Sequence, residues 1–349
     1  MIATAEQLAG LIAQIRAQDR IAIDTEADSL HSYREKLCLL QLSLPGGDYI
    51  LDPLANVDLA PLRDALQKKE IVLHGADFDL RLLHRSLNFI AQRIFDTVIA
   101  ARLLGIREFS LAALVERFFD VKLAKGSQKA NWARRPLSPR MLEYATNDTH
   151  YLLPLAERLE TELQERNRLD WLRQSCRRAI EQAAVSRVRD EDETWRIRGS
   201  GSLKGRAAAV LRALWRWREN EAAAVDRPPF HILQNHELLH AAESFASGSV
   251  PDYRHFSPRR RRAFCDAAQS ALKSPEEEWP VSRRRFGMRP SAEMARRSEE
   301  LRLRRDRVAK ELELEPTFIA PRATLEAIAA DHNRAASLLG PWQQSALGL

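Results

Sequence analysis

The stretch Ile21-Ala22-Ile23-Asp24-Thr25-Glu26 joins a short apolar run directly to two carboxylates. Side chains two residues apart in a β-strand point to the same face, so Asp24 and Glu26 would lie side by side at the end of a buried strand. Two carboxylates this close destabilise a fold unless a proton or a cation lies between them. The hexapeptide alone fits a strand running into an acidic loop equally well, so its interpretation depends on acids elsewhere in the chain.

Two further stretches place acids on suitable elements. In His74-Gly75-Ala76-Asp77-Phe78-Asp79 a buried strand gives way to a helix. Asp79 then lies in the first helical turn, where the helix dipole tolerates an anion. Tyr144 and Asp148 are four residues apart in a helical stretch and therefore project from one helix face. Each pattern alone is more typical of an ordinary helix N-terminus or a surface pair, so only their combination indicates a site.

The apolar runs predict an α/β fold built around the first strand. Further strands are expected at residues 37–44, 49–51 and 71–74. The first two of these are expected to form an antiparallel meander with the strand that begins at Ile21. The stretch Phe95-Asp96-Thr97 is expected to start a helix that runs through Leu104, with Asp96 or Thr97 as its N-cap. Ser138-Pro139 is expected to open one long helix that ends near Arg166. Strands followed by alternating strands and helices indicate a mixed sheet flanked by helices.

The charge of the chain is concentrated in its second part. The 349 residues are 45% hydrophobic, which is enough for two or three domains with their own cores. Residues 1–200 carry 29 basic and 29 acidic side chains, and residues 201–349 carry 25 and 19, so the net charge of +6 belongs to the latter. Basic clusters at 259–262 and 283–285 suggest a nucleic acid as the partner, with a solvated Arg-rich helix face as the alternative.

A charged, Gly- and Ser-rich segment divides the chain. We expect an α/β domain at residues 1–185, a linker at 186–202 and helical domains at 203–286 and 290–349. No apolar run is long enough to span a membrane, and the first residues lack the pattern of a secretion signal. Three separate cysteines, without zinc spacing, are typical of reduced thiols. These features predict a cytoplasmic protein.

Together, the three acidic motifs resemble those of the DEDD exonuclease superfamily, and the tyrosine marks the similarity to its DEDDy branch. The likeness extends in order and spacing to bacterial ribonuclease D. It is carried by Leu37-Cys38-Leu39-Leu40-Gln41-Leu42, His74-Gly75-Ala76, Phe95-Asp96-Thr97, Leu123-Ala124-Lys125-Gly126-Ser127-Gln128, Asn131-Trp132, Arg135-Pro136-Leu137-Ser138 and Tyr144-Ala145. Trp217-Arg218-Glu219 and Asp226-Arg227-Pro228-Pro229-Phe230 resemble the HRDC helical module of that family, and Leu339-Gly340-Pro341-Trp342 lies in a tail similar to a degenerate second module.

The resemblance implies a ribonuclease H-like exonuclease fold followed by HRDC-like helical modules. It implies a 3′→5′ exoribonuclease that releases nucleoside 5′-monophosphates from RNA 3′ ends, with tRNA precursors as substrates. Asp24, Glu26, Asp79 and Asp148 would hold two divalent cations, Mg²⁺ or Mn²⁺, and Tyr144 would orient the attacking water. This donor set is chemically reasonable, because small hard cations prefer carboxylate oxygens and a metal pair can stabilise both reacting oxygens.

Several alternatives remain open. A DNA 3′→5′ exonuclease is one alternative, because such enzymes use the same four acids and nothing in these motifs reads the 2′-hydroxyl that distinguishes RNA from DNA. A non-catalytic nucleic-acid-binding protein is another. The basic loop after residue 121 suggests Lys125, Trp132 and Arg135 as substrate contacts, although a structural role explains Trp132 equally well. The helical half binds either RNA or protein. Asp28, just after Glu26, either perturbs the metal site or faces solvent.

Overall fold

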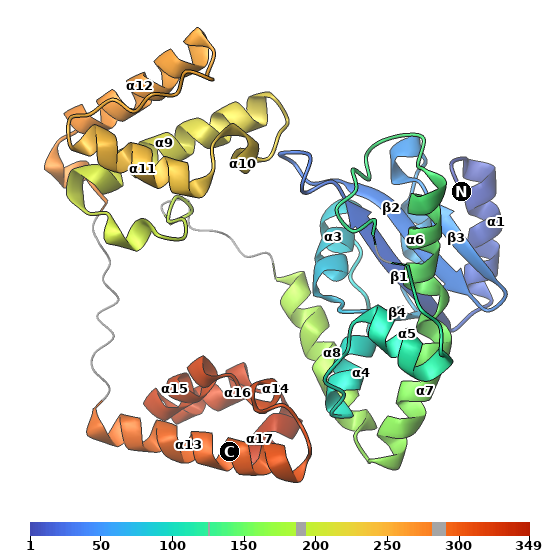
Figure 1. Ribbon diagram of the computed structural model, residues 1–349. Helices are drawn as coiled ribbons and strands as arrows, with labels where there is room; N and C mark the ends of the chain where they lie inside the picture. The colour runs from blue at the N-terminus through green and yellow to red at the C-terminus, as the bar shows by residue number, and fades with distance from the viewer. Residues whose placement is uncertain (125, 186–192, 281–290) are drawn as a thin grey trace. The chain divides into compact units, whose positions relative to one another are not determined.

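The computed structural model of the chain describes residues 1–124, 126–185, 193–280 and 291–349. The chain forms two compact units, which are considered separately here (Figure 1). The first unit takes in Met1–Ala27, Lys36–Ser186 and Met288–Leu349, and the second takes in Asp28–Glu35 and Arg187–Gly287.

A five-stranded sheet with the order β3-β2-β1-β4-β5 lies at the centre of the first unit (Figure 1). Its strands are β1 (Arg20–Ala27), β2 (Leu37–Leu44), β3 (Gly47–Leu51), β4 (Glu70–Leu73) and β5 (Arg93–Asp96). The first three strands pair antiparallel, which confirms the predicted meander, whereas β4 runs parallel to both β1 and β5. In the middle strand, Ile21, Ala22 and Ile23 are fully buried, so the strand that carries the acids is anchored by apolar packing.

The prediction was wrong at Phe95, which lies in strand β5 and does not begin a helix. Phe95 pairs with Val72 of β4 and is buried, as is Ile94. Asp96 is nevertheless the N-cap of the next helix, because its Oδ1 accepts a hydrogen bond from Val98 N at 2.8 Å. A four-residue strand offers too few apolar positions for periodicity to separate it from a helix start.

Helices flank the sheet, as the sequence predicts. They are α1 (Ala5–Arg16), α2 (Ala60–Leu66), α3 (Asp77–Leu87), α4 (Thr97–Leu103), α5 (Leu111–Phe119), α6 (Pro139–His150), α7 (Leu152–Glu165) and α8 (Leu169–Ala184), with a short 3₁₀ helix η1 (Pro53–Ala55). The single long helix expected from Ser138 is in fact α6 followed by α7. Pro154 explains the break: its ring would clash with the carbonyl of His150, whereas the first turn of a new helix tolerates proline.

The last part of the chain completes the first unit. It contains α13 (Ala292–Glu311), α14 (Pro316–Ile319), α15 (Arg322–Ala330), η4 (His332–Arg334), α16 (Ala335–Leu338) and α17 (Pro341–Leu347). The Trp342 ring stacks on Trp171 of α8 at 4.9 Å between centroids, and its Nε1 donates to Ser175 Oγ at 3.0 Å. Because its apolar residues also belong to the same buried cluster as the sheet, this module is part of the nuclease-side core.

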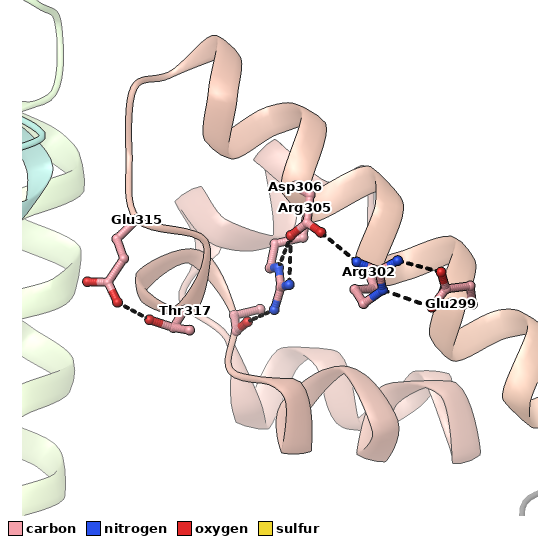
Figure 2. A network of polar contacts seen from close by, with 7 residues as sticks. Glu299, Arg302, Arg305, Asp306, Glu315 and Thr317 are labelled. Carbon is pink, nitrogen blue, oxygen red and sulfur yellow. Dashed lines mark hydrogen bonds and ion pairs between the residues drawn. The ribbon is translucent and has the colours of Figure 1, made fainter.

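A charge network holds the helices of this module together (Figure 2). Asp306 accepts hydrogen bonds from the guanidinium groups of both Arg302 and Arg305, at 2.9 and 2.6 Å. Arg305 is only 8% exposed, and its Nη1 also donates to the Ala320 carbonyl at 3.0 Å. Partnering of this kind is what makes burial of a guanidinium tolerable, and it links α13 to the segment before α15.

The second unit is helical throughout its described regular elements. These are η2 (Ser200–Ser202), α9 (Gly205–Ala224), α10 (Pro229–Ile232), α11 (Asn235–Ala246), α12 (Pro258–Lys273) and η3 (Glu276–Glu278). Trp217, Phe256 and Phe264 form an aromatic core with centroid distances of 4.9 to 5.7 Å. The buried Arg218 donates from Nη1 to Leu233 O at 3.2 Å and to Asn235 Oδ1 at 2.7 Å, and its Nη2 pairs with Glu219 at 3.4 Å, so both terminal nitrogens are engaged inside this unit.

Cys38, Cys176 and Cys265 are free thiols, as the sequence predicts. None of the helices described here combines the length and the apolarity that crossing a bilayer requires. The boundaries proposed above, with domains at 1–185, 203–286 and 290–349, remain predictions.

Gly105→Ala is expected to destabilise the first unit. Gly105 has a φ of +77°, and a Cβ there would lie 2.5 Å from the carbonyl oxygen of Glu313 in the C-terminal module. Backbone strain and the clash act in the same direction, so we expect a loss of at least about 1 kcal/mol in the free energy of unfolding, measured in urea.

Gly10→Ala is the matched control for this substitution. No heavy atom lies within 4 Å of a Cβ at Gly10, which sits inside helix α1, where alanine is favoured over glycine. If Gly105→Ala were as stable as Gly10→Ala, the close approach of the C-terminal module would be refuted.

Candidate active site

Strand β1 and helix α6 bring three of the four expected acids together. Asp24 and Glu26 are two residues apart on β1, and Asp148 projects from α6, which packs on the same strand. One carboxylate oxygen from each of these three residues lies within 4.8 Å of the others. Ser138 fixes the start of α6, since its side chain accepts a hydrogen bond from Met141 N and Pro139 occupies the first turn.

The fourth acid, Asp79, is held beside this group by a hydrogen bond from Thr25. Thr25 Oγ1 donates to Asp79 Oδ1 at 2.5 Å, and Asp79 is only 6% exposed. Asp79 lies in the first turn of α3, whose N-terminal segment is fixed by Asp96. That carboxylate accepts hydrogen bonds from Gly75 N at 3.1 Å and Ala76 N at 2.8 Å. The sequence offered no signal for either supporting contact, because strand alternation alone does not predict that Thr25 reaches α3.

All four acids line one hollow of about 760 Å³. The hollow is also lined by Tyr144, by the polar residues Thr25, His74, Ser110 and Gln128, and by the apolar residues Phe78, Leu111, Ala112, Leu123 and Ala124. A hollow that combines charged and apolar groups suits a ligand that carries both charge and a flat apolar group.

Burial raises the pKa of every one of these acids, and repulsion from the other acids of the group adds to it for Asp24, Glu26 and Asp148. The pKa of Glu26 rises to about 9, first through burial and then through the charges of Asp148 and Asp79. Burial also raises the pKa of Asp148 to about 7 and that of Asp79 to about 6. The pKa of Asp24 lies well above its ordinary range, because its burial adds to the charges of the other three. At neutral pH the group therefore takes up protons or cations.

Tyr144 is positioned as a hydrogen-bond donor. Its hydroxyl hydrogen-bonds the carboxylate of Asp148, and the side chain of Gln128 bonds the phenol as well. Burial and then the charges of Asp148, Glu26 and Asp24 raise the pKa of Tyr144 above its usual value, so the phenol keeps its proton. Gln128 was not among the expected site residues, although it lies in the basic loop that suggested substrate contacts.

This donor set fits hard divalent cations. Three carboxylate oxygens within 4.8 Å of one another offer the ligand type that Mg²⁺ and Mn²⁺ prefer. A bound cation would also reduce the repulsion that helps to raise the pKa values of Asp24, Glu26 and Asp148.

Two of the three residues expected to contact substrate, Trp132 and Arg135, are engaged within the protein. Trp132 is 1% exposed, and its ring packs behind Tyr144 with 6.0 Å between centroids, so burial corrects the expectation that it lines a substrate path and supports the structural alternative. Arg135 binds both carboxylate oxygens of Asp52 at 2.6 Å and donates to Cys38 O at 2.8 Å, which attaches the loop to the sheet. Its engagement leaves no support for a substrate role. Lys125 lies outside the described residues.

Asp28 closes a turn. Its carboxylate accepts a hydrogen bond from Ser32 Oγ at 2.5 Å, and its carbonyl accepts from His31 N at 2.7 Å. Asp28 is fully buried, so it does not face solvent, and it is absent from the group of three close carboxylates.

Without divalent cations, the stability of the folded chain should fall as the pH rises. The pKa of Glu26 is about 9 in the folded chain against an ordinary 4.5, so between these values the folded chain binds more protons than the unfolded chain. The free energy of unfolding therefore decreases with increasing pH. We expect the thermal midpoint in EDTA to drop across this window, and saturating Mg²⁺ or Mn²⁺ to reverse the drop.

Glu26→Gln tests the origin of this pH dependence, because the amide carries no titrating proton. We expect a flatter profile in EDTA and a smaller response to the cation. A wild-type midpoint that rises with pH in EDTA would contradict the buried acidic cluster.

Known proteins are similar to this chain in both sequence and fold. The profile of a 3′-5′ exonuclease family matches residues 1–164, and that of the HRDC domain matches residues 207–246. Ribonuclease D of Xanthomonas oryzae pv. oryzae is 31% identical over 345 residues, which cover 94% of this chain and 91% of that protein.

Two solved structures are similar over most of their length. Escherichia coli RNase D, an exoribonuclease involved in structured RNA processing, shows the same fold, with a TM-score of 0.75 at 23% identity over 100% of this chain and 96% of that one. The catalytic core of RRP6 from Trypanosoma brucei has a TM-score of 0.66 at 28% identity, covering 78% of this chain and 80% of that one. The chain thus belongs to the ribonuclease D family and is a 3′→5′ exoribonuclease.

Proposed function

We propose that this exoribonuclease trims RNA 3′ ends one nucleotide at a time, using two divalent cations held by Asp24, Glu26, Asp79 and Asp148. The observation that carries the proposal is the convergence of three half-buried carboxylates within 4.8 Å of one another. Such a group is stable near neutral pH only with protons or cations in it, and carboxylates are poor ligands once protonated.

Each residue has a separate role in this proposal. When bound, the cations would neutralise the charge that develops on the scissile phosphate and activate water as the nucleophile. Thr25 holds Asp79 through its 2.5 Å hydrogen bond, so the carboxylate that comes from α3 keeps its orientation toward β1. Asp24 and Glu26 are held by the central strand of the sheet, whose residues Ile21 to Ile23 are fully buried, and this limits movement of the cation site.

Tyr144 orients the attacking water by a hydrogen bond. Its raised pKa makes it a poor general base, because at neutral pH it holds its proton. The buried ring of Trp132 behind it, at 6.0 Å between centroids, restricts where the phenol can move. The raised pKa and the packing against Trp132 indicate that Tyr144 positions the water, and that another group accepts the proton of the water.

The proposed physiological substrates are tRNA precursors with 3′ extensions, in the cytoplasm. A relative of the same fold is described as processing structured RNA, and three free thiols fit a reducing compartment. The proposal requires that a tRNA transcript with extra 3′ nucleotides be shortened to the mature end faster than an unstructured RNA of equal length. Matched DNA oligonucleotides in the same assay test the DNA alternative, which predicts equal or faster cleavage of DNA.

Asp24→Asn is expected to abolish Mg²⁺-dependent release of nucleotides. The amide keeps the shape but removes a charge that the cations need, and metal stabilisation worth several kcal/mol corresponds to a rate loss of about 10³-fold or more. Release of 5′-monophosphates from a labelled RNA oligonucleotide measures the effect.

Asp77→Asn is the matched control for the loss of charge. Asp77 lies two residues from Asp79 but is exposed and paired with Arg81 at 2.5 Å, so its rate should stay near that of the wild type. Undiminished activity in Asp24→Asn would refute the cation site.

We infer that the helical second unit contributes phosphate contacts. Arg254 and Arg262 are exposed on or next to α12. Replacing both with serine should weaken RNA binding and reduce the slope of log affinity against log salt by about 1.4, which is about 0.7 for each lost contact with a single strand. Fluorescence anisotropy over a salt series measures this slope.

The same loss of two charges in the first unit provides the control. Arg16 and Arg158 are exposed positions of α1 and α7, and their double serine variant should keep the salt slope of the wild type. If the Arg254 and Arg262 variant also kept it, the second unit would be assigned to protein contacts.

A further inference from the structure

The hollow that holds the acids also contains an unusual side chain. Phe78 is 42% exposed and lines the hollow of about 760 Å³ together with Asp24, Glu26, Asp79 and Asp148. It lies in the first turn of α3, immediately before Asp79. Leu111 and Ala112 of α5 add further apolar lining. A large aromatic ring is thus left in contact with water directly beside the candidate cation site.

The fold itself does not require this ring. The side chains of α3 that pack into the unit are those of Asp79, Leu80, Leu82 and Leu83. Phe78 belongs neither to the buried core nor to the partly buried residues that pack against it. Its exposure therefore has no explanation in the packing of helix α3.

The other aromatic side chains near the acids are already engaged. Trp132 is 1% exposed, and the ring of Tyr144 packs against it at 6.0 Å while its hydroxyl bonds Asp148. Among the described residues that line the hollow, Phe78 is accordingly the aromatic face that a ligand can reach.

We propose that Phe78 stacks on a nucleobase next to the scissile phosphate of the RNA. This inference rests on the proposed function, since cations on the acidic wall would place the phosphate there. A nucleotide joins its charged phosphate to a planar apolar base through one sugar, which matches a hollow that holds both carboxylates and an exposed aromatic ring. Stacking does not depend on sequence, because every base has a π face, and this suits an enzyme that removes whichever nucleotide is at the 3′ end.

The test combines Phe78→Ala with RNA oligonucleotides that lack one base. Full-length wild type and variant are compared on a normal oligonucleotide, on one abasic at the 3′-terminal nucleotide and on one abasic at the penultimate nucleotide. Loss of a stacking partner costs about tenfold or more, so kcat/KM on the normal RNA should fall by that factor. On the oligonucleotide that lacks the stacked base, wild type and variant should differ by less than about twofold. Phe78→Trp should retain the wild-type rate on normal RNA.

Ile90→Ala provides the control, because Ile90 is 41% exposed in the same unit and does not line this hollow. It should match the wild type on all three oligonucleotides. The inference is overturned if Phe78→Ala equals the wild type on normal RNA, or if it loses the same factor on all three.

A binding experiment separates this inference from the proposed function. The dissociation constants of the three oligonucleotides are measured for Asp24→Asn and for Asp24→Asn combined with Phe78→Ala. The same base-dependent difference should appear in binding, where no cleavage is needed. Activity in Asp24→Asn would refute the cation site alone, whereas affinities that are equal with and without Phe78 would refute the stacking alone.

Discussion

Mutual repulsion among the half-buried carboxylates of Asp24, Glu26 and Asp148 is the constraint on which the rest of this structure depends. Their oxygens lie within 4.8 Å of one another, and Asp79 adds a fourth charge nearby. Left alone, such a group would push its own elements apart, so the fold has to hold the acids together by other means. The same repulsion makes the site receptive to divalent cations, because binding a cation removes it. The same electrostatic repulsion therefore destabilises the fold without cations and favours the binding of cations to the site.

Apolar packing and a few well-placed hydrogen bonds oppose that repulsion. Strand β1 is the middle of the sheet and fully buried along Ile21 to Ile23. Asp96 receives hydrogen bonds from the backbone that enters α3 and also caps α4, so one carboxylate orders two helix starts. The ion pair between Arg135 and Asp52 attaches the loop that carries Trp132, whose ring supports Tyr144. Asp96, Arg135, Asp52 and Trp132 do not line the hollow, yet they determine where the side chains that line it can lie.

The two helical parts of the chain differ in how they relate to the nuclease sheet. The C-terminal module shares a core with it, through the stacking of Trp342 on Trp171 and the close approach at Gly105. The other, which contains the match to the HRDC domain, belongs to a separate compact unit with its own aromatic core. Similar helical composition thus serves two purposes, stabilisation in one module and, as we propose, contact with RNA in the other.

Local spacing in the sequence was enough to predict the strand meander, an N-cap at Asp96 or Thr97, and the pairs Asp24 with Glu26 and Tyr144 with Asp148, whereas the structure decided for Asp96 as the cap. Pro154 also indicates the break after α6, although the prediction of a single long helix did not take this proline into account. Convergence of β1, α3 and α6 around one hollow, the burial of Trp132 and the exposure of Phe78 were decided only by the tertiary structure. The physical reason is that local sequence patterns act only over neighbouring residues, whereas these features depend on contacts between distant parts of the chain. Periodicity determines which side of its own element a residue faces, whereas burial and electrostatic coupling depend on which elements pack together.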